Sequence, residues 1–164
     1  MPLKNIQIQA KSFSSGFYDW IIFLINFYKR INQNLDIDFD SFIILQLVVS
    51  YNVYFINKSR DISLKELTFE FEKASQKSIK NNQKLTVTSI SSALNIPRET
   101  VKRKVLGLQK KQLLEIGSNK SVYLGKYYAK IFSDFATGTT LDLSKLIQRW
   151  DKNESLEKLR YLKF

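Results

Sequence analysis

The tripeptide Asn95-Ile96-Pro97 separates two short helical patterns and tightly limits how the chain can fold between them. Apolar residues recur at helical spacing from Val87 to Leu94, directly after Thr86, whose hydroxyl can cap a helix. Asparagine tolerates the left-handed backbone of a sharp turn, and Pro97 cannot continue the helix before it but can open the next one. The tripeptide therefore predicts a helix, a tight turn and a second helix.

The second helix is predicted over Arg98 to Lys110, because apolar side chains recur there with helical spacing. When the apolar residues of this helix face inward, charged residues face outward at its N-terminal end. The inward residues are Val101, Val105 and Leu108, and the outward residues are Arg98, Glu99, Lys102 and Arg103.

Two short strands follow, Gln112–Ile116 and Ser121–Leu124, joined by a turn over Gly117–Lys120. Helix, tight turn, helix and hairpin, in this order, form a winged helix-turn-helix, whose second helix enters the DNA major groove with its exposed N-terminal end. We therefore predict a mainly α fold, an α+β winged helix, with a recognition helix at 98–110 and a wing at 116–122.

The run Arg98-Glu99-Thr100-Val101-Lys102-Arg103 resembles the R-E-T-V-x-R recognition-helix motif of the catabolite-activator (Crp–Fnr) regulators. The resemblance covers about a quarter of the chain, residues 85–125, and implies base contacts from Arg98, Glu99 and Arg103. Side-chain chemistry agrees, since arginine binds guanine O6 and N7 with two bonds and glutamate accepts from cytosine N4.

The chain departs from that family at three points. Pro97 stands where the family often has a capping serine, and Gly107 lies inside the recognition helix. No glycine-rich β-roll precedes the motif, so cyclic-nucleotide binding is not implied.

Further polar residues are candidates for contacts to the DNA backbone. Lys120, at the tip of the wing, would approach the backbone or the minor groove. A role in helix capping explains Thr86, Thr88 and Ser89 equally well, and an ordinary solvated helix surface remains the alternative for 98–103. The candidates for phosphate contacts are Thr86, Thr88, Ser89, Lys102, Lys104 and Lys120.

Positive charge is concentrated around the same motif. The chain has a net charge of +11, and residues 96–130 hold nine lysines and arginines against two glutamates. Such a basic patch on a groove-reading motif is typical of nucleic-acid binding, although solubility alone would also explain it.

The composition excludes several kinds of chemistry. Cysteine and histidine are absent, which rules out disulfides, Cys/His zinc sites and Ser–His or Cys–His catalytic pairs. No glycine-rich phosphate loop is present, and carboxylates are scattered. We expect no enzyme activity, no cofactor and no metal.

Residues 1–35 are interpreted as a leader followed by a dimerisation helix at about Ser15–Asn32. This helix is apolar on nearly every face, so it should be buried on every face. A second subunit is the favoured partner, ahead of a purely intramolecular core and of membrane contact. No apolar run reaches the 18–20 residues or so of a spanning helix.

Residues 36–126 are predicted to form the winged core, with a polar insert at 58–84. Its first helix should run over about Ser41–Asn57, capped by Asp40 or Ser41. Within the insert, Ser63 and Glu66 form a capping-box pattern ahead of a helix at about Leu64–Ser78.

Residues 127–164 are predicted to hold two C-terminal helices for dimerisation. Gly138 should end a first segment, Tyr127–Thr137, and a final helix over about Leu141–Leu162 should kink at Asp151–Ser155. The order of long helix, core helix, helix-turn-helix, wing and long helix resembles the MarR-type regulators.

The favoured hypothesis is a cytoplasmic, homodimeric transcriptional regulator that binds specific sequences of double-stranded DNA. A winged-helix module for protein interaction or assembly is the alternative, together with a replication or plasmid-maintenance initiator. The resemblance to MarR-type regulators, whose dimers often hold a small-molecule effector between the dimer helices and the core, leaves such an effector open. Simple packing of the aromatic residues is the preferred interpretation.

Overall fold

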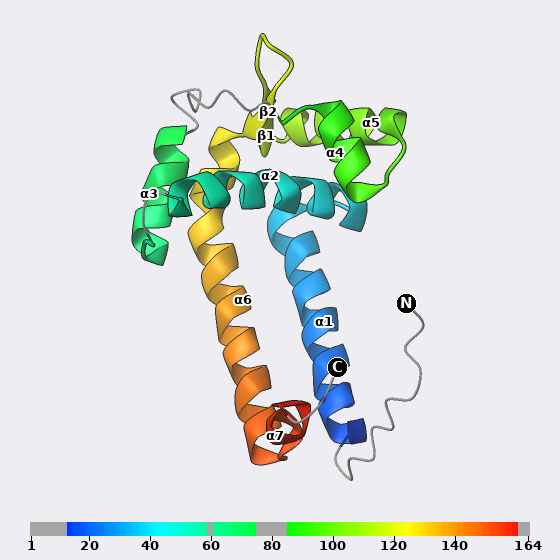
Figure 1. Ribbon diagram of the computed structural model, residues 1–164, viewed down its shortest axis with the longest axis vertical. Helices are drawn as coiled ribbons and strands as arrows, with labels where there is room; N and C mark the ends of the chain where they lie inside the picture. The colour runs from blue at the N-terminus through cyan, green and yellow to red at the C-terminus, as the bar shows by residue number, and fades with distance from the viewer. Residues whose placement is uncertain (1–12, 59–60, 75–84, 161–164) are drawn as a thin grey trace. The chain divides into compact units, whose positions relative to one another are not determined.

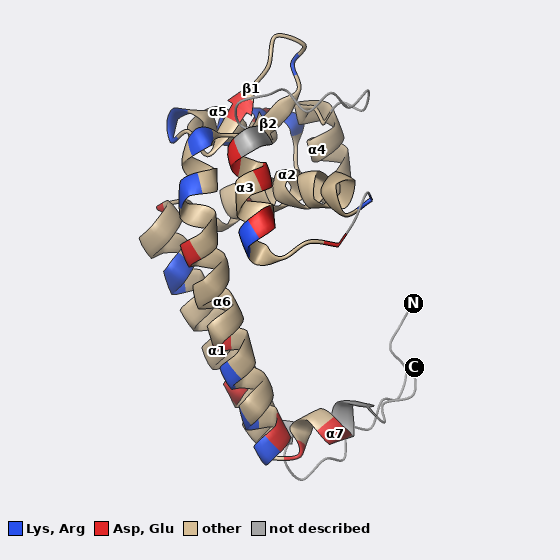
Figure 2. Cartoon of the chain, turned by 90° about the vertical axis from the view of Figure 1, so that its left-hand side faces the viewer, with Lys and Arg blue, Asp and Glu red and all other residues tan. Residues whose placement is uncertain are grey.

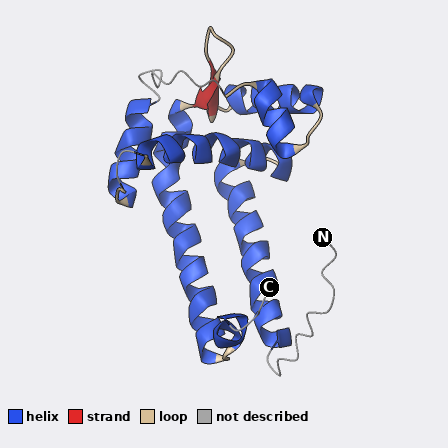
Figure 3. Cartoon of the chain, in the orientation of Figure 1, coloured by secondary structure: helices blue, strands red, loops and turns tan. Residues whose placement is uncertain are grey.

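A computed structural model describes residues 13–58, 61–74 and 85–160. This part of the chain is mainly helical and contains a two-stranded antiparallel sheet, which confirms the predicted mainly α class (Figure 3). The leader at 1–12, most of the loop within the predicted insert and the last four residues lie outside the described residues.

The elements follow the order shown in Figure 1. The helices are α1 (Phe13–Leu35), α2 (Phe39–Asn57), α3 (Leu64–Ala74), α4 (Val87–Leu94), α5 (Arg98–Lys110), α6 (Lys126–Lys152) and α7 (Ser155–Arg160), and the strands are β1 (Leu114–Ile116) and β2 (Val122–Leu124).

The chain divides into two compact units. The long-helix unit holds the described residues up to Arg30 and from Ala136 onward, and the core unit is Ile31–Phe135. Helices α1 and α6 each contribute residues to both units, so each unit is described by itself.

Helix α2 is the central element of the core unit. It packs against α4, α5 and β2, and its apolar side chains Ile44, Leu45 and Val48 are fully buried. Burying one such side chain stabilises the fold by about 1.5–3 kcal/mol, so α2 anchors the elements around it.

The N-terminal cap of α2 is Asp38, and not Asp40 or Ser41 as predicted. Its carboxylate accepts a hydrogen bond from the backbone N–H of Ser41 at 2.9 Å. The apolar pattern begins at Phe42, but the backbone is already helical from Phe39, so the cap lies earlier.

Helix α3 packs through one aromatic side chain onto the start of α6. The ring of Phe71 lies 4.7 Å from that of Phe132 and 6.0 Å from that of Tyr128. The capping box is confirmed, because Ser63 N–H donates to the Glu66 carboxylate at 2.9 Å. The predicted continuation of this helix to Ser78 lies outside the described residues.

The helix-capping residues predicted on either side of α4, before the turn at Asn95-Ile96-Pro97, are confirmed. Thr86 caps α4 in a capping box with Ser89, and Asn95 ends α4 in the left-handed conformation, at φ 53° and ψ 39°. The hairpin strands are shorter than predicted, because Gln112 adopts a left-handed φ of 57° and Ser121 forms only an isolated bridge to Thr86.

Helix α6 is continuous from Lys126 to Lys152, so the prediction that Gly138 ends a helix is wrong. Within the long-helix unit, the guanidinium of Arg30 lies against Gly138 and forms an ion pair with Asp142. A side chain at 138 would occupy the place of that guanidinium. The chain breaks instead at Asn153–Glu154, inside the predicted kink region.

The long-helix unit pairs α1 with the second half of α6 in antiparallel directions. The indole N–H of Trp150 donates to the carbonyl of Gly16 at 2.9 Å, and Arg149 lies 3.4 Å from Asp19. The opposite side of α1 is exposed in the single chain, and its predicted burial against a second subunit stays a prediction. Its exposed apolar residues are Phe17, Tyr18, Trp20, Ile21, Leu24, Ile25 and Tyr28.

By length and apolar composition alone, α2 meets the criteria for a membrane-spanning helix, with a mean hydropathy of 1.5. The expectation that no segment has this property was therefore too strict. Seven residues of α2 are nevertheless buried within the protein, which is also the property of a core helix.

Candidate nucleic-acid interface

Burial of one face of α5 determines which of its side chains meet solvent. Val101 and Val105 are fully buried and Leu108 nearly so, where α5 packs against α2 and α4. The opposite face therefore carries the charged residues, as the helical periodicity predicted. The exposed residues of the first two turns are Arg98, Glu99, Lys102 and Arg103.

The turn before α5 fixes where this charged end begins. The Ser91 hydroxyl donates to the carbonyl of Ile96 at 2.7 Å, which holds the turn closed. Pro97 has φ −53° and supplies no side-chain cap to α5. The first N–H groups of α5 consequently add partial positive charge to an end that already carries Arg98.

The two arginines of the motif have no ion-pair partner among the described residues. Glu99 and Lys102 face each other at 3.8 Å, and both are well exposed. An exposed pair of this kind contributes little stability, roughly 0.2–1 kcal/mol, so a ligand could separate it at small cost. Figure 2 shows the lysines and arginines of α5.

Lys104 lies at the edge of the buried face and has a partner within the chain. Its ammonium donates to the carboxylate of Asp38, and its side chain is 19% exposed. This hydrogen bond is the largest cause that lowers the pKa of Asp38. Lys111 binds Asp36 in the same way and lowers the pKa of that carboxyl.

Thr86 and Ser89 use their hydroxyls on each other's backbone. Thr86 Oγ1 accepts from the Ser89 N–H at 3.2 Å, and Ser89 Oγ accepts from the Thr86 N–H at 2.7 Å. Ser89 Oγ also donates to the Thr86 carbonyl at 2.9 Å. Of the three hydroxyl residues predicted at this helix end, Thr88 is the exposed one.

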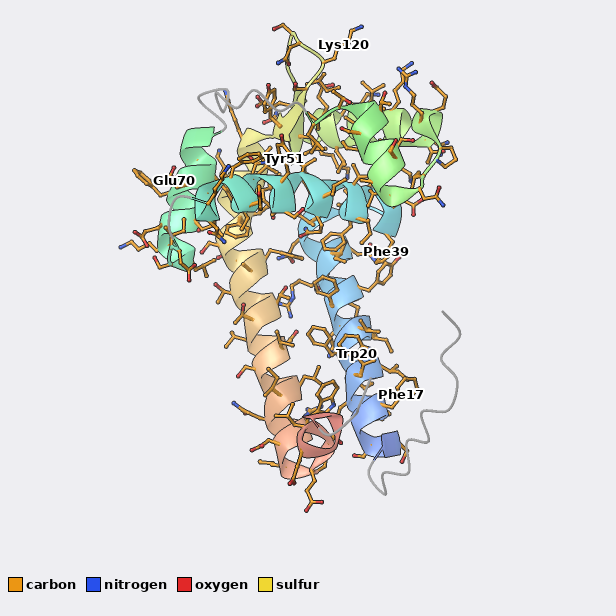
Figure 4. The ribbon with its side chains drawn as sticks, viewed as in Figure 1. Phe17, Trp20, Phe39, Tyr51, Glu70 and Lys120 are labelled. Carbon is orange, nitrogen blue, oxygen red and sulfur yellow. The ribbon has the colours of Figure 1, made fainter. Side chains whose placement is uncertain are left out.

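Lys120 lies at the tip of the hairpin, where Figure 4 labels it. The strands pair Leu114 with Leu124 and Ile116 with Val122. Lys120 is exposed and left-handed, with φ 63°, and its N–H donates to the carbonyl of Gly117 at 2.9 Å. The hairpin thus holds a single cation at its tip.

The exposed face of α5 extends further than the sequence motif suggested. Leu106 is 42% exposed, and Lys110, one helical turn further, is also exposed. A helical projection of Arg98–Lys110 would have placed both beside Arg103, because residues three, four and seven apart share a face. The resemblance drew attention only to the first two turns.

Among the described residues, no three side chains gather in a way that could hold a metal ion. Comparison of the chain with protein-family models, curated proteins and solved structures finds no match. The function of this protein therefore has to be inferred from the chemistry of its own surfaces.

Proposed function

We propose that this protein is a sequence-specific transcriptional regulator that binds double-stranded DNA through a winged helix-turn-helix core. The observation that carries the proposal is the exposed, cationic N-terminal end of α5. It follows a tight turn after α4 and precedes a hairpin with Lys120 at its tip. Helix α5 would be the recognition helix and the hairpin the wing.

The first two turns of α5 offer the donors and acceptor that base edges require. Arg98 and Arg103 can each donate two hydrogen bonds to guanine O6 and N7, and Glu99 can accept from cytosine N4. Lys102 can exchange its weak pair with Glu99 for a phosphate. The four side chains are exposed together, so they can act on one short stretch of duplex.

The remaining predicted residues divide into two roles. Thr88, Lys102 and Lys120 are exposed and available for phosphate oxygens. We assign Thr86 and Ser89 to positioning, because their hydroxyls cap α4. Lys104 positions α5 through Asp38, and this pair would have to open before Lys104 could bind a phosphate.

We further propose a homodimer formed through the exposed apolar face of α1. No charged residue lies between Asp19 and Lys29, whereas the chain as a whole carries +11. Because this face carries no charge, two copies can meet on it without charge repulsion. Two copies would present two recognition helices to a roughly palindromic site, about 34 Å apart.

A DNA regulator of this kind would act in the cytoplasm, with α2 as a core helix rather than a membrane span. The rings of Phe71, Tyr128 and Phe132 pack on one another, whereas Phe17, Tyr18 and Tyr28 are exposed. The proposal includes no small-molecule effector. The alternative of a protein-interaction module predicts no strong binding to duplex DNA.

Salt-dependent binding to duplex DNA tests the proposal. Affinity should fall steeply as salt rises, with a logarithmic slope of about −0.9 for each phosphate contact. Lys120→Ala should weaken binding to all sequences alike and reduce the slope by about that amount. Lys65→Ala, an exposed lysine on α3, serves as the control. Binding that is weak and insensitive to salt would favour the interaction module.

A further inference from the structure

Four of the five glycines lie where a side chain would collide with the chain itself. A Cβ at these positions would come within 3 Å of another residue, so a neighbour would have to move at each of them, with the least effort at Gly138, where that neighbour is the flexible end of the Arg30 side chain. The glycines and the residues they would meet are Gly16 with Ser155, Gly117 with Tyr123, Gly125 with Gln112 and Gly138 with Arg30.

Gly107 has no such neighbour among the described residues. It lies inside α5, where glycine costs roughly 1 kcal/mol relative to alanine. A Cβ built there meets no atom of the described residues within 4 Å, and its backbone is not left-handed. Neither the packing nor the backbone of the described chain requires glycine at this position.

The surroundings of Gly107 on α5 are those of a contact surface. Gly107 follows Arg103 by one helical turn, and Leu106 beside it is exposed. Leu106 in turn lies one turn beyond Lys102, and Lys110 follows at the next turn. We call Leu106 and Gly107 the apolar patch of α5. It is an uncharged part of the exposed surface, between Lys102 and Arg103 on one side and Lys110 on the other.

We infer that DNA packs directly on the apolar patch, with Leu106 contacting the 5-methyl group of a thymine. Glycine allows another molecule to approach a helix backbone closely, and thymine is the base that presents a methyl group in the major groove. The inference rests on the proposed function and extends the reading surface of α5 by about one turn. It makes a specific thymine part of the recognised sequence.

The first test is Gly107→Ala. The free protein has room for the added methyl group, so the variant should fold and melt at a higher temperature. Its affinity for the DNA site should fall roughly tenfold or more, because overpacking an interface is costly. Ser50→Ala is the matched control: Ser50 is exposed on α2, and its hydroxyl bonds to the carbonyl of Leu47 in its own helix.

The second test replaces each thymine of the selected site by uracil, which removes one methyl group. At one position the wild-type protein should lose roughly fourfold in affinity, the value of one buried methyl-sized group. Leu106→Ala should bind thymine and uracil equally well at that position.

Unchanged affinity of Gly107→Ala, with equal binding of thymine and uracil by the wild-type protein, would overturn the inference. If Arg98→Ala still weakened binding in that case, the proposed function would stand without it. No binding of duplex DNA by the wild-type protein would overturn both.

Discussion

At the scale of single residues, neighbouring lysines and arginines of α5 have different roles because burial divides them. Arg103 points to solvent, whereas Lys104, the next residue, is held by Asp38. The exposure of Arg103 follows from helical periodicity and was predictable. The partner of Lys104 was not, because Asp38 lies 66 positions away and only tertiary packing brings it close.

Replacing Arg98 by alanine should weaken binding of the preferred site by about 1–3 kcal/mol and relax the base preference at one position. The thermal midpoint should stay unchanged, because Arg98 is exposed and has no described ion-pair partner. Competition binding against single-base variants of the site measures both effects. A variant that retains full affinity and preference would show that Arg98 does not read bases.

At the scale of elements, local signals predicted the boundaries that local chemistry sets. Thr86 caps α4 and Asn95 ends it, as the sequence indicated. Gly138 was misinterpreted because its role is tertiary: it accommodates the Arg30 guanidinium within a continuous helix. Gly107, in contrast, has no partner of this kind among the described residues, so its role had to be inferred from the structure.

Gly125→Ala should destabilise the core unit by about 1–3 kcal/mol. The added methyl group would overlap the backbone of Gln112 and Leu113, which cannot move as a flexible side chain can. Gly107→Ala is the matched control and should instead gain stability. Urea unfolding compares the stabilities of the two variants. Equal unfolding midpoints would contradict the close packing of Gly125 against the backbone of Gln112 and Leu113.

Acid should weaken the link between α5 and the start of α2. Lys104 lowers the pKa of Asp38 in the folded state, so this pair stabilises the fold above the unfolded value of about 3.9. That contribution is lost as the pH falls through the lowered folded pKa.

Asp38→Asn removes the carboxylate charge that faces Lys104, while asparagine can still cap the helix. At neutral pH the variant should be less stable by roughly 0.2–1 kcal/mol, as for exposed ion pairs. The difference should shrink as the pH falls through the lowered pKa of Asp38. Urea unfolding between pH 7 and 2.5 measures it, and a constant difference across that range would exclude the charge pair as its cause.

At the scale of the whole molecule, the two units make different demands on a partner. The core unit buries a cluster of apolar residues around α2, among them Ile44, Leu45 and Val48, whereas α1 in the long-helix unit leaves a charge-free apolar face in solvent. Its apolar pattern was readable from the sequence. Which of its faces meets solvent depended on the pairing of α1 with α6, which no local signal reveals.

A charge on the exposed face of α1 should dissociate the proposed dimer. Leu24→Asp should give a monomer by sedimentation equilibrium and weaken binding to a palindromic site more than to a half-site. Leu64→Asp, on the exposed side of α3, is the control and should remain dimeric. A wild-type protein that is monomeric at micromolar concentration would contradict the assignment of α1.

The most direct measurement is selection and sequencing of duplexes that the purified protein retains from a random DNA library. The Arg98→Ala/Arg103→Ala double variant is run in parallel. The wild-type protein should enrich one roughly palindromic sequence, and the double variant should lose it. Retained duplexes without a shared sequence, or no retained duplexes, would contradict sequence-specific recognition by α5.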